Sequence, residues 1–283
     1  MEKIAVLGAG LMGASIAQEA AQAGYQVILR DLQMSFVRDG LKTIEDHLDE
    51  QMAKGQMNRR EKEQVLDHIH GTIDLAALNQ VDLVIEAVVE NIAVKKQLFT
   101  ELDNICPEHT ILATNTSSLS ITEIAATTRR PDRVIGMHFV HPLPRMQLVE
   151  LVKGMETSEE TLQTVCSYVE QMKKKYVVVN RESPGYIVNR VLAVYINEAI
   201  TILGEGLADT ETLDTALCLG VGMPVGPLAL ADQIGLDQLY AALIGFYEEF
   251  RDSKYRPHIM FSTMVRAGYY GRKSGRGFYR YQD

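Results

Sequence analysis

One histidine and one glutamate in the middle third of the chain have the residue types that proton transfer to or from an alcohol requires. His138 ends one apolar, β-branched stretch, and Glu150 lies within the next. An imidazole can accept and return a proton near neutral pH, and a carboxylate on its second ring nitrogen fixes the tautomer and stabilises the imidazolium. The two residues alone are equally compatible with a hydrogen-bonded histidine at a strand end and a solvated surface glutamate.

A glycine-rich segment near the N-terminus indicates where a hydride acceptor would bind. It reads Gly8-Ala9-Gly10-Leu11-Met12-Gly13, which is GxGxxG between an apolar run at residues 4–7 and a helical pattern that continues to residue 23. The first two glycines allow a tight turn close to a pyrophosphate, and the third lets helix and strand pack together. Free N–H groups at the helix start would hold the negative charge. This context predicts a dinucleotide-binding turn rather than a turn without a ligand.

Asp31 predicts which dinucleotide binds. It follows the second predicted strand, where a carboxylate accepts hydrogen bonds from the ribose 2′-OH of NAD and repels the 2′-phosphate of NADP. Arg30 precedes it, and the alternation of side chains along a strand predicts that Arg30 points to the opposite face. We therefore expect NAD as the cofactor.

The elements that position these residues follow from hydrophobic periodicity. The segment 4–29 reads strand, turn, helix, strand, which is one βαβ unit and requires a parallel sheet. Helical spacing on both sides of Gly55 predicts a helical hairpin inserted before the third strand. Further strands are expected at 81–85, 110–113, 134–137, 148–152 and 176–179, and helices at 92–105, 121–126 and 158–174.

The chain is too long for a single core, and Ser183-Pro184-Gly185 is the predicted break. Beyond it the pattern is helical except at residues 277–279. The predicted fold class is α/β: a doubly wound Rossmann-type sheet with a helical-hairpin insertion, followed by a smaller all-α domain. We place the NAD-binding domain at residues 1–184 and the helical substrate and dimerisation domain at residues 185–283.

Charge and cysteine content narrow the possible partners and compartment. The formal net charge of -9 and the pI near 5.3 argue against nucleic acid or an anionic membrane as a partner. The longest uncharged run, at residues 215–231, is interrupted by glycines and prolines and is unsuited to a membrane span. Three widely spaced cysteines without a CxxC pair, and no signal-peptide pattern, favour the cytoplasm.

Over essentially its whole length the chain resembles the L-3-hydroxyacyl-CoA dehydrogenase family, most closely the short bacterial 3-hydroxybutyryl-CoA dehydrogenases. The likeness rests on GAGLMGASIAQ at 8–18, EAVVEN at 86–91, ATNTSSLSITEIA at 113–125, RVIGMHF at 133–139, LVELV at 148–152, SPGYIVNR at 183–190, GPLALADQIGLD at 226–237 and KSGRGFY at 273–279. The resemblance implies an enzyme that reversibly oxidises a short-chain (S)-3-hydroxyacyl-CoA, such as 3-hydroxybutyryl-CoA, to the 3-oxoacyl-CoA with NAD. It also implies a homodimer formed through the C-terminal helical domain.

The resemblance assigns catalytic and substrate roles to four residues. It makes His138 the general base and acid, oriented by Glu150. It makes Ser117 and Asn189 contacts of the 3-oxygen and the thioester carbonyl of the substrate. From the sequence alone, Ser117 is also interpreted as a helix N-cap and Asn189 as a capping or domain-bridging residue.

Further matched residues are charged. The resemblance places Glu90 and Lys95, together with Ser117, near the nicotinamide and ribose, and it lets Lys273 reach the cofactor. It lets Lys54, at the basic bend of the predicted hairpin, meet the phosphates of CoA. Each of these charges taken alone would be interpreted as a solvated surface group.

The chain departs from the family motif HFFNP, because it reads His138-Phe139-Val140-His141-Pro142. His141 thus replaces the asparagine next to the nicotinamide. Neutral imidazole can donate one hydrogen bond in its place, but it is bulkier and titratable, so we expect activity with an altered rate, pH dependence or cofactor affinity. A metal site at His138, His141 and Glu150 is the alternative, but no further acidic or thiol ligand is near and we predict no metal.

Two other functions stay open from the sequence. A related dehydrogenase would act on a 3-hydroxy acid without CoA, such as a sugar acid; Lys54 and the basic hairpin favour CoA instead. A non-catalytic dinucleotide-binding protein would keep the same fold, and His141 is the one feature that favours it.

Overall fold

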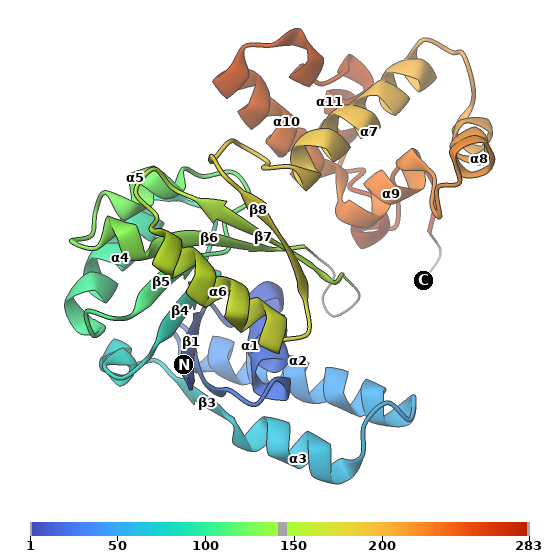
Figure 1. Ribbon diagram of the computed structural model, residues 1–283. Helices are drawn as coiled ribbons and strands as arrows, with labels where there is room; N and C mark the ends of the chain where they lie inside the picture. The colour runs from blue at the N-terminus through green and yellow to red at the C-terminus, as the bar shows by residue number, and fades with distance from the viewer. Residues whose placement is uncertain (1, 141–145, 282–283) are drawn as a thin grey trace. The chain divides into compact units, whose positions relative to one another are not determined.

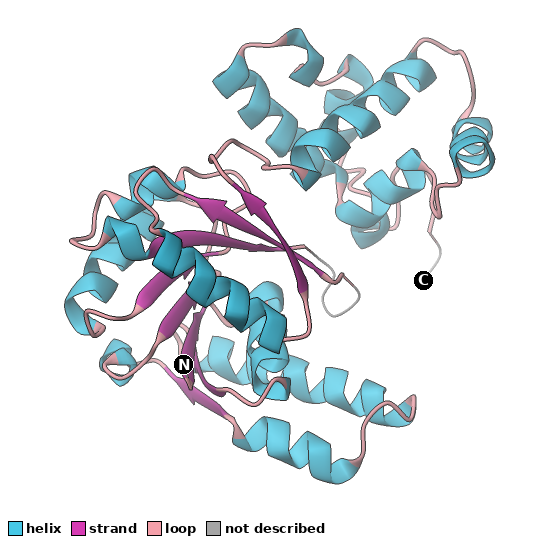
Figure 2. Ribbon diagram, in the orientation of Figure 1, coloured by secondary structure: helices cyan, strands magenta, loops and turns pink. Residues whose placement is uncertain are grey.

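Figure 1 shows the computed structural model of the protein, which describes residues 2–140 and 146–281. The chain forms two compact units, Met1–Ser183 and Pro184–Asp283. The first contains a sheet with helices on both faces, and the second is helical (Figure 2). The predicted fold class is confirmed.

The described part of the first unit contains one eight-stranded sheet in the order β3-β2-β1-β4-β5-β6-β7-β8. Its strands are β1 (Lys3–Leu7), β2 (Gln26–Arg30), β3 (Ile69–Thr72), β4 (Leu83–Glu86), β5 (Ile111–Thr114), β6 (Val134–Phe139), β7 (Leu148–Lys153) and β8 (Lys175–Val179). The helices of this unit are α1 (Leu11–Gln22), α2 (Met34–Ala53), α3 (Arg59–Asp67), α4 (Ile92–Ile105), α5 (Ile121–Ala125) and α6 (Glu159–Gln171).

The inner strands β1, β4 and β5 are buried on both faces, which explains why they are almost continuous apolar runs. One core combines side chains of α1 and α6 with alternate strand residues such as Val6, Met137 and Leu151. The opposite alternate positions face α5, because a Cβ on Gly136 would lie 2.4 Å from Ile121 of that helix. Polar N-caps start the helices on this side: Asn91 accepts from Val94 N and Ser120 from Glu123 N.

The sheet differs from the prediction at both of its margins. Residues 69–72 form β3, which pairs in parallel with β2, whereas no strand was expected between the βαβ unit, which ends at residue 29, and residue 81. Near the other margin β7 runs antiparallel to β6, so the sheet is mixed. The reason is the length of the connection, because a parallel return requires a crossover of about a dozen residues or more.

The predicted helical hairpin is confirmed as α2 and α3, which lie side by side and project from the sheet (Figure 1). Asn58 starts α3 with a capping box: its side chain accepts from Glu61 N, and the Glu61 carboxylate accepts from Asn58 N. The bend between the helices, with Lys54 at its start, lies at the tip of this projection.

The second unit contains α7 (Val188–Gly204), α8 (Thr210–Val221), α9 (Pro227–Ile234), α10 (Leu236–Phe250) and α11 (Ile259–Arg266) around a core of its own. The buried carboxylates of Asp214 and Asp232 tie it together: Asp214 accepts from the first N–H groups of α9 and from Tyr279 Oη, and Asp232 accepts from Phe278 N and Tyr279 N. Residues 277–279, expected as a strand, lie instead between isolated bridges in a C-terminal segment held by these carboxylates.

Candidate active site and cofactor cleft

The glycine-rich turn joins β1 to α1 and is packed so closely that two of its glycines admit no side chain. Gly8 has φ +97°, and a Cβ there would lie 2.5 Å from Ala87 O at the end of β4. A Cβ on Gly13 would lie 1.7 Å from Gly8 O. A Cβ on Gly10, at the start of α1, would meet nothing within 4 Å. The turn is therefore closed toward the protein and open at the helix N-terminus, which fits a dinucleotide pyrophosphate.

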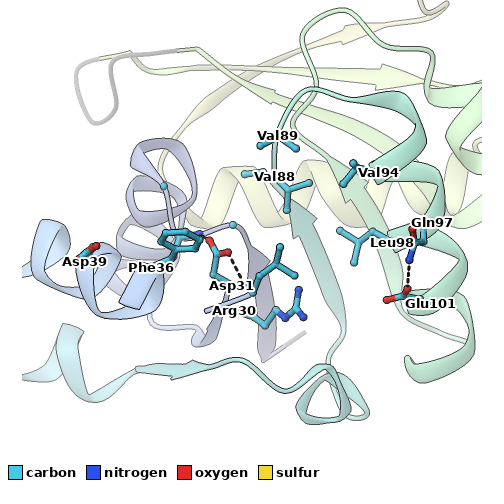
Figure 3. A pocket seen from close by; sticks show the side chains of 15 residues that line it. Arg30, Asp31, Phe36, Asp39, Val88, Val89, Val94, Gln97, Leu98 and Glu101 are labelled. Atoms are coloured by element: carbon cyan, nitrogen blue, oxygen red, sulfur yellow. Dashed lines mark hydrogen bonds between the residues drawn. The ribbon is translucent and has the colours of Figure 1, made fainter. Parts of the chain in front are cut away.

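Beside this turn lies a cleft of about 670 Å³, mostly apolar, between the ends of β1 and β2 and the segment that follows β4 (Figure 3). A cleft with apolar walls and few polar groups is the usual form of a cofactor site. Its lining residues are Gly8, Ala9, Gly10, Arg30, Asp31, Leu32, Phe36, Asp39, Ala87, Val88, Val89, Val94, Gln97, Leu98 and Glu101.

Asp31 is held at the cleft by two backbone donors. Its Oδ2 accepts from Ala9 N at 2.7 Å, and its Oδ1 accepts from Leu32 N at 2.6 Å. The carboxylate thereby joins the glycine-rich turn to the end of β2, where it would accept a hydrogen bond from a ribose hydroxyl. Arg30, expected on the opposite face, lines the same cleft, with its Nε donating to Ile73 O at 3.2 Å. The face alternation fails here because β2 ends at Arg30 and Asp31 lies beyond the strand.

His138 and Glu150 form a hydrogen-bonded pair. They are directly opposite partners in the antiparallel β6–β7 ladder, so that both side chains leave the same face of the sheet. Nδ1 of His138 lies 2.7 Å from Oε2 of Glu150. Both residues are buried, His138 at 7% and Glu150 at 0% exposure. A buried carboxylate at this distance accepts Nδ1–H, so the assigned tautomer leaves the lone pair on Nε2.

The pair lies at the edge of the sheet where the cofactor turn also lies. Strands β1, β4, β5 and β6 are parallel neighbours, so their C-terminal ends share one edge. Asn115 connects these ends: its N–H donates to Glu86 O at the end of β4, and its side-chain Oδ1 accepts from Phe139 N at the end of β6. The residue after His138 is thus fixed to the segment that leads to Ser117.

Ser117 follows β5 and lies beside Glu90. Its backbone N donates to Glu90 Oε1 at 3.2 Å, and the same oxygen accepts from Thr116 Oγ1 at 2.5 Å and Ser118 Oγ at 3.2 Å. Ser117 is not the N-cap of α5, since Ser120 occupies that position. The structure therefore brings Glu90 and Ser117 together and leaves the Ser117 hydroxyl without the capping role that the sequence allowed.

Lys95 is buried and is not the solvated surface charge that its residue type alone suggests. Its exposure is 1%, and its Nζ lies 2.5 Å from Glu86 Oε1 and 3.4 Å from Glu90 Oε2. Glu86 is itself fully buried at the end of β4 and was missed by sequence reasoning. The available signal was its place directly after the apolar residues Val84 and Ile85 of a buried strand, because a glutamate is seldom buried there unless it has a partner.

The remaining predicted residues lie apart from these groups or in the other unit. Lys54 ends α2 and pairs with Glu50 at 3.4 Å, with 62% of its side chain exposed. In the second unit, Asn189 is half-buried in the first turn of α7, and Lys273 Nζ lies 2.6 Å from Asp237 Oδ1. His141 lies outside the described residues.

Within residues 2–140 and 146–281, no three His, Cys, Asp or Glu side chains form a group that could hold a metal ion. Over the same ranges, no helix has both the length and the apolar character needed to cross a bilayer.

Comparison with known proteins agrees with this geometry. Residues 3–183 match the family model for the NAD binding domain of 3-hydroxyacyl-CoA dehydrogenase, and residues 185–281 match the model for its C-terminal domain. A probable 3-hydroxybutyryl-CoA dehydrogenase from Bacillus subtilis (strain 168) is 47% identical over 283 residues, which cover 100% of this chain and 98% of that protein. A 3-hydroxybutyryl-CoA dehydrogenase from Clostridioides difficile is 46% identical over 279 residues and 99% of each chain.

Solved structures give the same result. The crystal structure of (S)-3-hydroxybutyryl-CoA dehydrogenase PaaH1 from Ralstonia eutropha has a TM-score of 0.96 with this chain at 44% identity, over 100% of both chains. The family models together span both units, so the resemblance inferred from short motifs is confirmed over the whole chain. The chain belongs to the 3-hydroxyacyl-CoA dehydrogenase family of oxidoreductases, whose first domain binds NAD.

Proposed function

We propose that this protein catalyses the reversible NAD-dependent oxidation of short-chain (S)-3-hydroxyacyl-CoA, with 3-hydroxybutyryl-CoA as the expected substrate. The observation that carries the proposal is the buried contact of 2.7 Å between His138 Nδ1 and Glu150 Oε2, at the sheet edge shared with the glycine-rich turn. The names of relatives at 44–47% identity support the choice of substrate. We assign cofactor binding to residues 1–184, and substrate binding and dimerisation to residues 185–283.

The chain's own contribution to the reaction is proton transfer. His138 Nε2 takes the proton of the substrate hydroxyl in the oxidation and returns it to the carbonyl oxygen in the reduction. Glu150 accepts Nδ1–H throughout, which keeps the lone pair of the neutral ring on Nε2 and stabilises the imidazolium once the proton has moved. When bound, NAD supplies the acceptor for the hydride from the hydroxyl-bearing carbon. Burial of both side chains strengthens this electrostatic coupling.

NAD would be held by groups already at the cleft. The N–H groups at the start of α1, beside Gly8, Gly10 and Gly13, would receive the pyrophosphate, and Asp31 would accept from the ribose. We also assign Leu11 and Met12, which continue this turn, to NAD binding. Glu90 follows β4 and Ser117 follows β5, and these parallel strands end at the sheet edge where the turn lies, which supports the assignment of both residues to the nicotinamide half.

Substrate binding is assigned to hydrogen-bonding and basic groups. Ser117 and Asn189 would contact the 3-oxygen and the thioester carbonyl, and Lys273 would reach the cofactor. Lys54 would meet the phosphates of CoA. An exposed lysine–carboxylate pair contributes little free energy, so a phosphate can displace Glu50 from Lys54 at small cost.

Steady-state kinetics test the proposal. NADH oxidation should be fast with acetoacetyl-CoA, and kcat/KM with free acetoacetate should be at least a hundredfold lower. Equal or greater turnover of the free acid would favour the dehydrogenase of CoA-independent 3-hydroxy acids. His138→Gln should abolish turnover and leave NADH binding intact, and an active variant would remove the histidine from the mechanism. His141→Asn measures how far His141 alters cofactor affinity and the pH profile.

We also propose a homodimer, formed through the helical unit, in the cytoplasm. Several large apolar side chains of that unit are exposed: Val191, Leu207, Leu219, Val221 and Ile259. Such side chains lose contact with water when two copies associate. Sedimentation of the full chain as a monomer at micromolar concentration would contradict the dimer.

The proposed location in the cytoplasm is supported by the free cysteines Cys106, Cys166 and Cys218, because free thiols persist in a reducing compartment. Recovery of the protein in a secreted fraction would contradict this location.

A further inference from the structure

Glu86 is a fully buried carboxylate that takes no part in the proposed proton transfer. It lies at the C-terminal end of β4, and its exposure is 0%. Lys95, from α4, places its ammonium 2.5 Å from Glu86 Oε1 and is buried to 1% exposure. Taking both charges out of water is costly, and a well-packed apolar pair would often be at least as stable. The pair is therefore better explained by what it positions than by stability alone.

Glu86 connects the wall of the cofactor cleft to the next strand. Its Oε1 accepts from Val88 N at 2.7 Å as well as from Lys95, and Val88 lines the cleft. Its Oε2 accepts from Thr114 Oγ1 at 2.7 Å, at the end of β5. One carboxylate thus fixes the end of β5 relative to the segment against which the glycine-rich turn packs.

Lys95 extends this connection toward Ser117. Its ammonium also lies 3.4 Å from Glu90 Oε2, and the other oxygen of Glu90 accepts from Thr116 Oγ1 and Ser117 N. The contacts run without a gap from Glu86 through Lys95 and Glu90 to Ser117. Solvent access increases along this series, because Glu86 and Lys95 are buried whereas 41% of the Glu90 side chain is exposed.

We propose that Glu86 is a positioning residue for the reaction: through Lys95 and Thr114 it sets the position of Glu90 and Ser117 relative to the cofactor cleft beside the glycine-rich turn, where Asp31 places the adenosine half of NAD. The proposal rests on the proposed function, because it assigns Glu90 and Ser117 to the nicotinamide half of the cofactor and to the substrate. It predicts that loss of the Glu86 charge disturbs that half while the adenosine half still binds.

The test compares Glu86→Gln, which keeps the shape and an acceptor for Val88 N, with the double variant E86Q/K95M, which also removes the buried ammonium. Glu123→Gln is the matched control, since it removes a carboxylate from an exposed pair with Lys96, the neighbour of Lys95 on α4. The dissociation constants of NADH and of ADP-ribose, which lacks nicotinamide, are measured by calorimetry. Melting temperature, kcat and the KM for acetoacetyl-CoA complete the set.

Glu86→Gln should raise the Kd of NADH and lower kcat at least tenfold each, and change the Kd of ADP-ribose less than threefold. Glu86→Gln should also lower the melting temperature, because the buried Lys95 ammonium loses the Glu86 carboxylate. The double variant should regain melting temperature but not kcat, because it also removes the ammonium that contacts Glu90. Equal weakening of NADH and ADP-ribose binding, or full recovery of kcat in the double variant, would overturn the proposal. The role of Glu86 would then be to compensate the buried charge of Lys95. A wild-type protein that binds NADH but turns over no acyl-CoA would refute the proposed function alone, since the two binding constants still test the positioning role.

Discussion

Replacing Glu150 by glutamine is the most direct probe of the proton-transfer pair. The change keeps the size of the side chain at a fully buried position and removes one negative charge 2.7 Å from His138 Nδ1. The amide oxygen can still accept Nδ1–H, so the ground-state tautomer is retained. What is lost is the attraction that stabilises the ring when it becomes positively charged.

The magnitude follows from the distance between the charges. For charge centres about 4 Å apart and an effective dielectric constant of about 20, the attraction is about 4 kcal/mol. A neutral hydrogen bond from the ring to the amide returns about 1 kcal/mol of this. The net loss of about 3 kcal/mol corresponds to a fall in kcat of about a hundredfold, at about 1.4 kcal/mol for each factor of ten.

The assay is NADH oxidation by acetoacetyl-CoA, with kcat and both KM values determined at several pH values. Glu159→Gln is the matched control, because it removes a largely exposed carboxylate that pairs with Lys153, the last residue of β7, and should change kcat less than twofold. The Kd of NADH should stay within threefold in both variants, which separates lost catalysis from misfolding. A fall in kcat of less than fivefold for Glu150→Gln would refute the assigned coupling.

Three further predictions follow from the cleft and from the acid stability of the fold. Asp31→Ser removes a carboxylate that would repel a 2′-phosphate and leaves Arg30 as the cation among the lining residues of the cleft, so the ratio of kcat/KM for NADPH to that for NADH should rise at least tenfold; an unchanged ratio would exclude Asp31 as the selector. Gly13→Ala would put a Cβ 1.7 Å from a backbone oxygen of the turn, so calorimetry should show at least tenfold weaker NADH binding, and wild-type affinity would contradict the packing. Burial acts to raise the pKa of Asp103, but hydrogen bonds from Arg129 and its neighbour outweigh it and hold the pKa below 3.8. The ionised carboxylate therefore stabilises the fold above that value and ceases to do so as the pH falls through the lowered pKa, so Asp103→Asn should lower the melting temperature at pH 7 and flatten its decline below about pH 4.

The sequence was most informative where one local pattern determines the structure. The glycine spacing, the apolar run before it and Asp31 predicted the βαβ unit because all of these lie within one contiguous segment. The apolar strands that carry His138 and Glu150 are neighbours in the chain and suggested the pair, but the residues alone were equally compatible with structural roles, and the family resemblance was needed to assign it. Assigning roles to isolated polar residues such as Asn189 required the family resemblance, because the residue type alone has several structural uses.

What the sequence did not reveal depends on contacts between distant segments. Strand β3 contains one large apolar residue, Ile69, and becomes a strand only by pairing with β2 some forty residues earlier. The burial of Lys95 beside Glu86 requires a helix and a strand end to meet, and a lysine at a helix surface position gives no local sign of this. Ser120 rather than Ser117 caps α5, and both serines satisfy the same local rule.

The pairing of β6 with β7 has a consequence for how such a protein can diverge. Because His138 and Glu150 are opposite partners in the ladder, their meeting depends on strand alignment and not on the intervening connection. A single residue inserted inside β7 would turn Glu150 to the other side of the sheet. Substitutions in the connection can therefore accumulate in descendants of this chain while the pairing of His138 with Glu150 is retained.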